Sequence, residues 1–162
     1  MKLFLKIIAG LLVAVVLGFG GLMFFKGMKS KDIKLANIGM ENGRLIKCGP
    51  KPNCVCSIGN EDSEKHHIAP LEFANDDLAM ELWQKIKGVM NSQGFQLVSE
   101  KDDYLHYTHT STIMGFVDDI EFHRPQGAKR IDLKSSSRVG YSDLGANRKR
   151  LTKIVLYLKQ AN

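Results

Sequence analysis

Residues 135–150, SSSRVGYSDLGANRKR, decide how the rest of the chain is interpreted. Glycines divide this stretch into the end of a strand, a turn and the start of a helix. Polar groups gathered at such a junction are typical of a functional site. The candidate site residues here are Ser135, Ser137, Arg138, Tyr141, Asp143, Asn147, Arg148 and Arg150.

An amphipathic helix follows this stretch. Its apolar side chains recur at the spacing i, i+3, i+4, i+7, which predicts that it packs on one face of a sheet; they are Leu151, Ile154, Val155 and Leu158. Asn147 and Arg148 stand four and three residues before Leu151, so we expect both to turn toward that sheet. Asp118, Asp143, Ser135 and Ser137 are their expected partners.

Two strands are predicted before the motif, at residues 116–123 and 129–138. Alternation places Asp118 on the covered face with Phe116, Ile120 and Phe122, and places Asp119 and Arg138 together on the opposite face. A buried carboxylate without a partner is costly. We therefore expect Asp118 to be paired with a basic or hydroxyl group.

A helix and two further strands are predicted upstream. Asn75 is a suitable N-cap for a helix with apolar residues at helical spacing, and Gly94 is placed to end it. Short strands are predicted from Phe95 and over residues 104–109. The predicted fold is α+β, with a four-stranded antiparallel meander and two helices on one face, over residues 45–162.

An uncharged apolar run covers residues 7–25, IIAGLLVAVVLGFGGLMFF. About twenty residues are enough to cross a bilayer, so we expect an anchor in residues 1–31 and a linker in residues 32–44. A cleaved signal peptide is the alternative, although no A-x-A triplet precedes a cleavage point. The membrane is thus an expected partner of residues 7–25.

Two signals disagree on which side of the membrane the domain lies. More lysines follow the apolar run than precede it, which favours a cytoplasmic domain. Cys48, Cys54 and Cys56 lie close together, and disulfides persist outside the cytoplasm. We expect a single-pass protein of the cytoplasmic membrane with its domain on the extracytoplasmic side.

The three cysteines allow more than one arrangement. A bridge from Cys48 to Cys54 would close a short loop already bent by Pro50 and Pro52. Cys56 could compete for Cys48, and a zinc site that includes His66 and His67 is a further alternative. We predict the Cys48–Cys54 bridge and no metal or cofactor.

The basic composition does not indicate nucleic-acid binding. Five of the 23 lysines and arginines lie in residues 1–31 with no acidic residue, which leaves 18 basic against 17 acidic residues. A nearly neutral domain lacks the cluster of cations that neutralises several phosphates at once. We expect no nucleic acid among the partners.

Two motifs resemble the domain of unknown function 1499 family. Around the cysteines, Cys48, Pro52, Asn53, Cys54, Val55 and Ser57 match its pattern, and Cys56 stands where the family tends to have serine. The longer match runs through Gly115, Phe116, Asp118, Asp119, Glu121 and Phe122, and then through Ser135, Ser137, Arg138, Gly140, Ser142, Asp143, Gly145, Asn147, Arg148 and Arg150. The resemblance covers residues 45–158 and implies an exported or membrane-attached protein, with no implied reaction.

Three interpretations of the polar motif compete. The first is a structural hydrogen-bonded network. The second is a non-catalytic site for a polar or anionic ligand, such as a lipid head group, or for a protein partner. The third is an enzyme that uses Asp118, Asp119 and the motif from Arg138 to Arg150. Adjacent strand residues point to opposite faces and make no carboxylate pair, and the sequence has no G-x-S-x-G, Walker or H-E-x-x-H motif. If the network is structural, loss of Arg148 should leave Asp118 or Asp143 without its partner.

Overall fold

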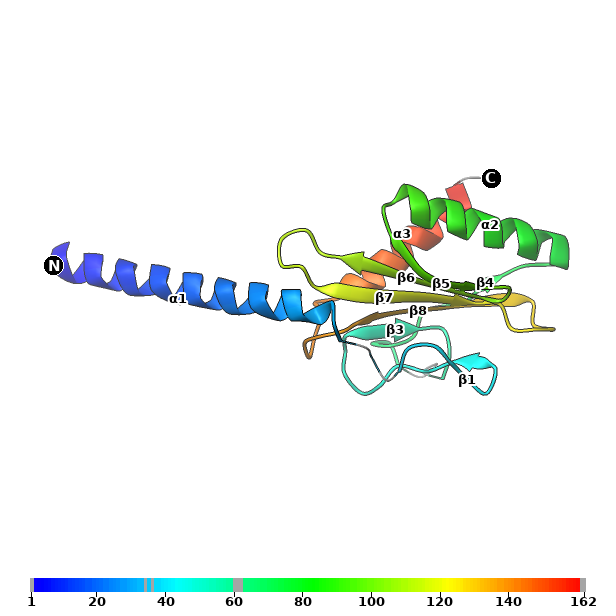
Figure 1. Ribbon diagram of the computed structural model, residues 1–162, viewed down its shortest axis with the longest axis horizontal. Helices are drawn as coiled ribbons and strands as arrows, with labels where there is room; N and C mark the ends of the chain where they lie inside the picture. Colours follow the sequence, from blue (N-terminus) through cyan, green and yellow to red (C-terminus); the bar gives the residue numbers. More distant parts are fainter. Residues whose placement is uncertain (1, 34, 36, 60–62, 161–162) are drawn as a thin grey trace.

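The computed structural model describes residues 2–33, 35, 37–59 and 63–160. Met1, Lys34, Ala36, Ala161 and Asn162, which fall within the predicted anchor, linker and domain, lie outside the described residues, as do residues 60–62. In chain order, the elements are α1 (Lys2–Ser30), β1 (Met40–Glu41), β2 (Arg44–Leu45), β3 (Cys54–Cys56), β4 (Leu71–Glu72), α2 (Asp76–Ser92), β5 (Gln96–Lys101), β6 (Tyr104–Thr110), β7 (Val117–His123), β8 (Arg130–Ser137) and α3 (Ala146–Gln160) (Figure 1).

The main sheet is antiparallel, in the order β3-β8-β7-β6-β5, and β4 also pairs with β8. It therefore has six strands, and the predicted four correspond to β5–β8. Val55 of β3 pairs with Ser135, and Leu71 of β4 pairs with Ile131, so both extra strands lie along the outer edge of β8. With three and two residues, β3 and β4 are too short to show an alternation in the sequence.

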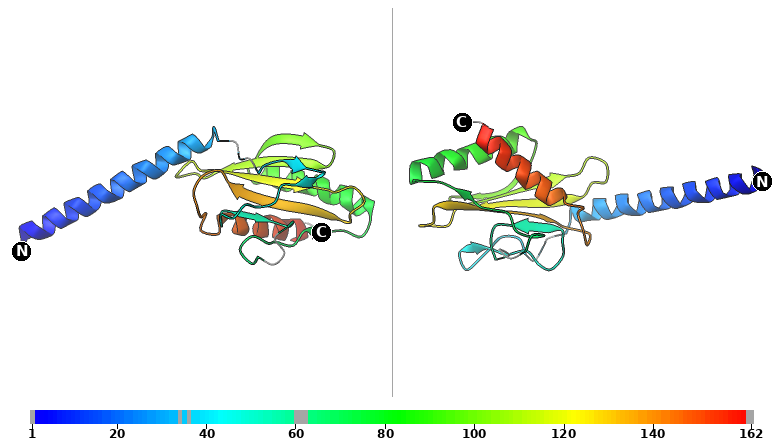
Figure 2. Two further views of the ribbon diagram at one scale, coloured as in Figure 1. Left: turned by 90° about the horizontal axis from the view of Figure 1, so that it is seen from below. Right: turned by 180° about the vertical axis from the view of Figure 1, so that it is seen from behind.

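Helices α2 and α3 lie on the same side of the sheet (Figures 1 and 2). Asn75 begins α2 as predicted, because its side chain accepts a hydrogen bond from the Leu78 amide at 2.9 Å. One apolar core joins the two helices to the sheet through Trp83, Ile86, Met90, Leu105, Tyr107, Ile120, Phe122, Ile131, Leu133, Leu151, Ile154 and Leu158. The predicted α+β class is confirmed.

The opposite face of the sheet is polar and yet buried. Residues 37–45, which include part of the expected linker and carry β1 and β2, pass over this face (Figure 1). The Gly39 amide donates to Glu121 Oε1 at 2.6 Å, and Lys134 donates to the Asn37 carbonyl. The covered side chains of this face are Tyr104, His106, Asp119, Glu121, His123, Asp132 and Lys134.

Among the described residues, α1 is the helix that is long and apolar enough to cross a membrane. Most of it projects away from the domain, but its last turn contacts the domain (Figures 1 and 2). Ser30 is fully buried, and its hydroxyl donates to the Gly115 carbonyl at 3.3 Å and accepts from the Val117 amide at 3.0 Å. Gly27 is buried against Met114, and a Cβ there would lie 1.6 Å from the Met114 carbonyl oxygen.

This contact predicts that Gly27→Ala separates α1 from the residue 111–116 loop, because neither backbone can accommodate the added methyl group. In protein reconstituted into vesicles, trypsin should cleave faster after Lys29 or Lys31 in the variant than in the wild type. Gly21→Ala is the matched control, since nothing lies within 4 Å of a Cβ at that position. Equal cleavage rates in the two variants would contradict the contact.

Candidate functional site

The turn between β8 and α3 is held by Asp143. Its carboxylate accepts hydrogen bonds from the Gly145 amide at 3.0 Å and from the Asn147 amide at 2.7 Å. These bonds satisfy amides at the start of α3, where the helix has no internal acceptors. Gly145 has φ +79°, a left-handed conformation that glycine adopts without steric cost. Asp143 therefore shapes the turn and begins the helix.

Asn147 connects the start of α3 to the neighbouring strands. Its amide nitrogen donates to the Asn53 carbonyl at 3.0 Å and to Ser137 Oγ at 2.9 Å. Its carbonyl oxygen accepts from Ser135 Oγ at 2.5 Å and from Arg150 at 2.7 Å. The side chain is fully buried, so each of these partners would otherwise lack a bond or require water.

Arg150 is the partner of Asp118. The two side chains are 2.6 Å apart and 11% and 10% exposed, and His109 Nδ1 lies 3.4 Å from the same guanidinium. We expected the Arg148 side chain to turn toward the sheet, and that prediction is wrong. The half-buried Arg148 side chain donates instead to the Glu64 carbonyl at 2.6 Å, in a bond that is open to solvent. The first turn of α3 directs positions 147 and 150 toward the sheet, because residues three apart share one face of a helix.

Asp119 forms a second cluster on the opposite face of the sheet. Arg138 donates to its two carboxylate oxygens at 2.8 Å each, and His106 Nε2 lies 2.8 Å from Oδ1. Burial opposes ionisation of this carboxylate, but the hydrogen bonds from Arg138 and His106 outweigh burial and lower the pKa of Asp119. Arg138 also donates to the Lys31 carbonyl at 2.9 Å and so connects this cluster to the end of α1.

A third polar cluster, which the sequence analysis did not predict, lies beside the Asp119 cluster. Glu121 and Lys134 form a fully buried ion pair at 3.1 Å, and the Tyr104 hydroxyl donates to Glu121 at 2.7 Å. Burial and the neighbouring Glu121 charge raise the pKa of Tyr104. Glu121 and Lys134 are directly opposite each other in the β7–β8 pairing. Opposite charges at paired positions of two predicted strands are a sequence signal for an ion pair. The sequence does not show that a short segment covers Glu121 and Lys134 and buries them.

Asn53 is a further member of the hydrogen-bonded network that the sequence analysis did not predict. It follows Pro52 and lies next to Cys54, which is bonded to Cys48 as predicted, with an S–S distance of 1.99 Å. The side chain of Asn53 donates to the Gly140 carbonyl at 2.9 Å. The disulfide loop is therefore tied to the turn after β8. Cys56 is buried outside this bridge, and its thiol donates to the Ile58 carbonyl at 3.1 Å.

The polar motif thus divides between the two faces of the sheet, and most of its groups satisfy one another. Two members differ: the Tyr141 side chain is exposed, and Arg148 donates to the Glu64 carbonyl outside the motif. Among the residues that the structure describes, no three or more His, Cys, Asp or Glu are arranged to hold a metal ion. The use of these residues as a ligand site stays a prediction.

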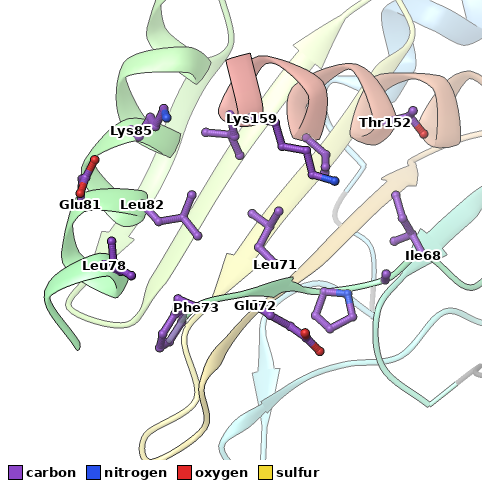
Figure 3. A pocket seen from close by; sticks show the side chains of 14 residues that line it. Ile68, Leu71, Glu72, Phe73, Leu78, Glu81, Leu82, Lys85, Thr152 and Lys159 are labelled. Carbon is purple, nitrogen blue, oxygen red and sulfur yellow. The ribbon is translucent and has the colours of Figure 1, made fainter. Parts of the chain in front are cut away.

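An apolar groove lies away from the motif, between α2, α3 and β4 (Figure 3). Its volume is about 700 Å³. Its apolar wall comprises Ile68, Ala69, Pro70, Leu71, Phe73, Leu78, Leu82, Val155 and Leu158. Glu72, Glu81, Lys85, Thr152 and Lys159 supply polar groups around it.

The family model described as "Protein of unknown function (DUF1499)" matches residues 44–158. The chain belongs to this family, in agreement with the resemblance of its two motifs. A comparison with curated proteins found no match.

The network predicts a large difference between neighbouring variants. Asn147→Ala should lower the free energy of unfolding by about 3 kcal/mol or more, because each buried group left unsatisfied costs roughly 1–3 kcal/mol. Arg148→Ala is the matched control and should lower it by about 1 kcal/mol or less, because it removes one solvent-exposed hydrogen bond from a half-buried side chain. Urea unfolding of the full chain in mild detergent measures both. Equal losses would show that Asn147 is not the centre of the network.

His123, which is buried, and His109, which is half-buried, predict that acid destabilises the protein. Burial lowers the pKa of His123 and of His109 below 6.5, and the Arg150 charge lowers the latter further. The folded state therefore binds fewer protons, so their contribution to stability is complete above pH 6.5 and is lost as the pH falls through the folded pKa values. The urea midpoint should fall between about pH 7.5 and about pH 5.5, around the ordinary histidine pKa. A constant or rising midpoint would refute this.

Proposed function

We propose that the chain is a single-pass membrane protein whose extracytoplasmic domain is a non-catalytic binding module for an amphipathic ligand. The observation that carries this proposal is the apolar groove of about 700 Å³ between α2, α3 and β4. Ligand pockets in proteins have volumes of about 300–1,000 Å³ and mostly apolar walls with a few polar groups. The ligand we infer has one apolar chain and one polar end, as lipids and fatty acids do.

The composition of the groove supports this ligand class. Leu78, Leu82 and Val155 can bury an alkyl chain, which gains about 0.8 kcal/mol for each methylene group removed from water. Thr152 and Lys159 come from the same helix as Val155 and can contact a polar head. Because Glu72 and Glu81 also lie around the groove, its charges suit a head group that is small or carries both signs.

The polar motif gives less support to the two other candidate functions, which are an anion-binding site within the motif and an enzyme. Arg138 and Arg150 are each engaged by a buried carboxylate, so neither guanidinium is presented to an anionic ligand. Asp118 and Asp119 point to opposite faces of β7, and each has its own arginine. This argues against a general acid and base acting on one substrate. We therefore infer a structural role for the motif and a binding role for the groove.

The membrane arrangement rests on two observations. Helix α1 is long and apolar enough to span a bilayer, and the Cys48–Cys54 disulfide suits an oxidising compartment. We propose an anchor in residues 1–31 and a globular unit in residues 45–162. Residues 32–44 connect them, and Asn37 and Gly39 of this segment are hydrogen-bonded to Lys134 and Glu121 of the sheet.

A photoactivatable fatty acid that carries a diazirine tests the groove in the full chain reconstituted into vesicles. Mass spectrometry should find crosslinks in residues 68–85 and 152–159. Leu78→Asp should abolish these crosslinks, because it places a charge on the apolar wall near the start of α2. Met80→Asp is the matched control, since Met80 lies on the same helix but does not line the groove. Crosslinks confined to α1, or equally weakened by both variants, would contradict the proposal.

Fusion of reporters after Asn162 tests the orientation. An enzyme that works only outside the cytoplasm should be active in this position, and one that works only inside should be inactive, because a disulfide favours an oxidising compartment. Activity of the cytoplasmic reporter alone would reverse the proposed orientation.

A further inference from the structure

Two loops of the domain present large apolar side chains to solvent. Ile113 is 81% exposed in the β6–β7 loop, and Tyr141 and Leu144 are 72% and 90% exposed in the β8–α3 loop. Among the described residues outside α1, the other exposed large apolar side chains reach at most 52%, at Val98. Apolar side chains exposed to this degree indicate an interaction site when they gather on one part of the surface.

Both loops lie at the end of the sheet where α1 joins the domain. The Arg138 amide donates to the Val117 carbonyl at 3.2 Å, so the end of β8 lies beside the start of β7. Figures 1 and 2 show the two loops projecting from this end, on the side from which α1 departs. The three apolar side chains therefore belong to one end of the molecule.

The register of α1 relates this end to the bilayer surface. The uncharged run ends at Phe25, and Lys26 is the first charged residue after it. Gly27 contacts Met114 and Gly115, two residues beyond Phe25 and hence about 3 Å along the helix axis. The loop that carries Ile113 thus meets α1 at the level where the apolar segment ends.

The backbone of the second loop favours the same interpretation. Leu144 has φ +54°, a left-handed conformation that is uncommon for any residue except glycine, asparagine and aspartate. The amides on each side of its side chain are fixed by local bonds, Leu144 to Ser142 Oγ at 3.2 Å and Gly145 to Asp143 at 3.0 Å. An apolar side chain held outward on a strained backbone is a reason to look for a functional contact.

We propose that Ile113, Tyr141 and Leu144 insert into the head-group region of the bilayer that α1 spans. Tyrosine is favoured at membrane interfaces because its ring is apolar and its hydroxyl is polar. The exposed Lys26 and Lys29 at the same level can attract anionic head groups. This inference rests on the anchoring part of the proposed function.

A second membrane contact would fix how the domain stands on the surface. β4, which lines the groove, pairs with Ile131 near the start of β8, whereas the two loops lie beyond its other end at Arg138. Seven residues of strand separate these positions by roughly 24 Å. The groove would therefore open well above the head groups, toward ligands in the extracytoplasmic space.

Tryptophan quenching by brominated lipids tests this contact in the full chain, reconstituted into vesicles that contain phosphatidylglycerol. Single substitutions Ile113→Trp and Tyr141→Trp report on the two loops, and Leu144 is left unchanged because its backbone is left-handed. Leu22→Trp reports on α1, and Leu156→Trp is the control on the exposed side of α3. The native Trp83 is buried and contributes the same background to every variant.

We expect brominated lipid to reduce the fluorescence of the variants at positions 22, 113 and 141 relative to unbrominated lipid, and to leave the variant at 156 unchanged. Quenching at 22 without quenching at 113 and 141 would overturn the second contact and leave the anchor intact. Absence of quenching at 22 would overturn the anchor and, with it, this inference.

Discussion

Two adjacent carboxylates in the middle of the sheet impose the constraint on which the structure depends. Asp118 and Asp119 point to opposite faces of β7, and both are buried. Each must be neutralised, because an unpaired buried charge costs several kcal/mol. Arg150 supplies the charge on the helix side and Arg138 on the other side. The turn from β8 to α3 is the segment between these two arginines, so the aspartates hold it at both of its ends.

The same clusters join parts of the chain that are far apart in sequence. Asn147 binds the carbonyl of Asn53 beside the disulfide, and Arg138 binds the carbonyl of Lys31 at the end of α1. On the face away from the helices, Gly39 and Asn37 are held by polar contacts with Glu121 and Lys134. Such contacts are directional, and they fix a single register more strictly than apolar packing does.

The sequence predicts the helices, the four long strands, the disulfide and the face of each aspartate, because these follow from periodicity and spacing. It does not predict which residue of α3 pairs with Asp118, since Arg148 and Arg150 differ by only half a turn and the exact start of the helix decides between them. It also misses the buried Glu121–Lys134 pair. Alternation shows that these residues share a face, but only the path of residues 37–45 shows that the face is covered. The groove arises from the packing of three elements and has no local signal.

A double-mutant cycle between Asp118 and Arg150 tests the structural account of the motif most directly. Asp118→Ala and Arg150→Ala should each lower the free energy of unfolding by about 3–5 kcal/mol, because each leaves one buried charge without its partner. The double variant should lose much less than the sum of the two, which corresponds to a coupling energy of roughly 2–3 kcal/mol. Small and additive effects in the ligand-free protein would contradict this account and would return the motif to the status of a candidate binding site.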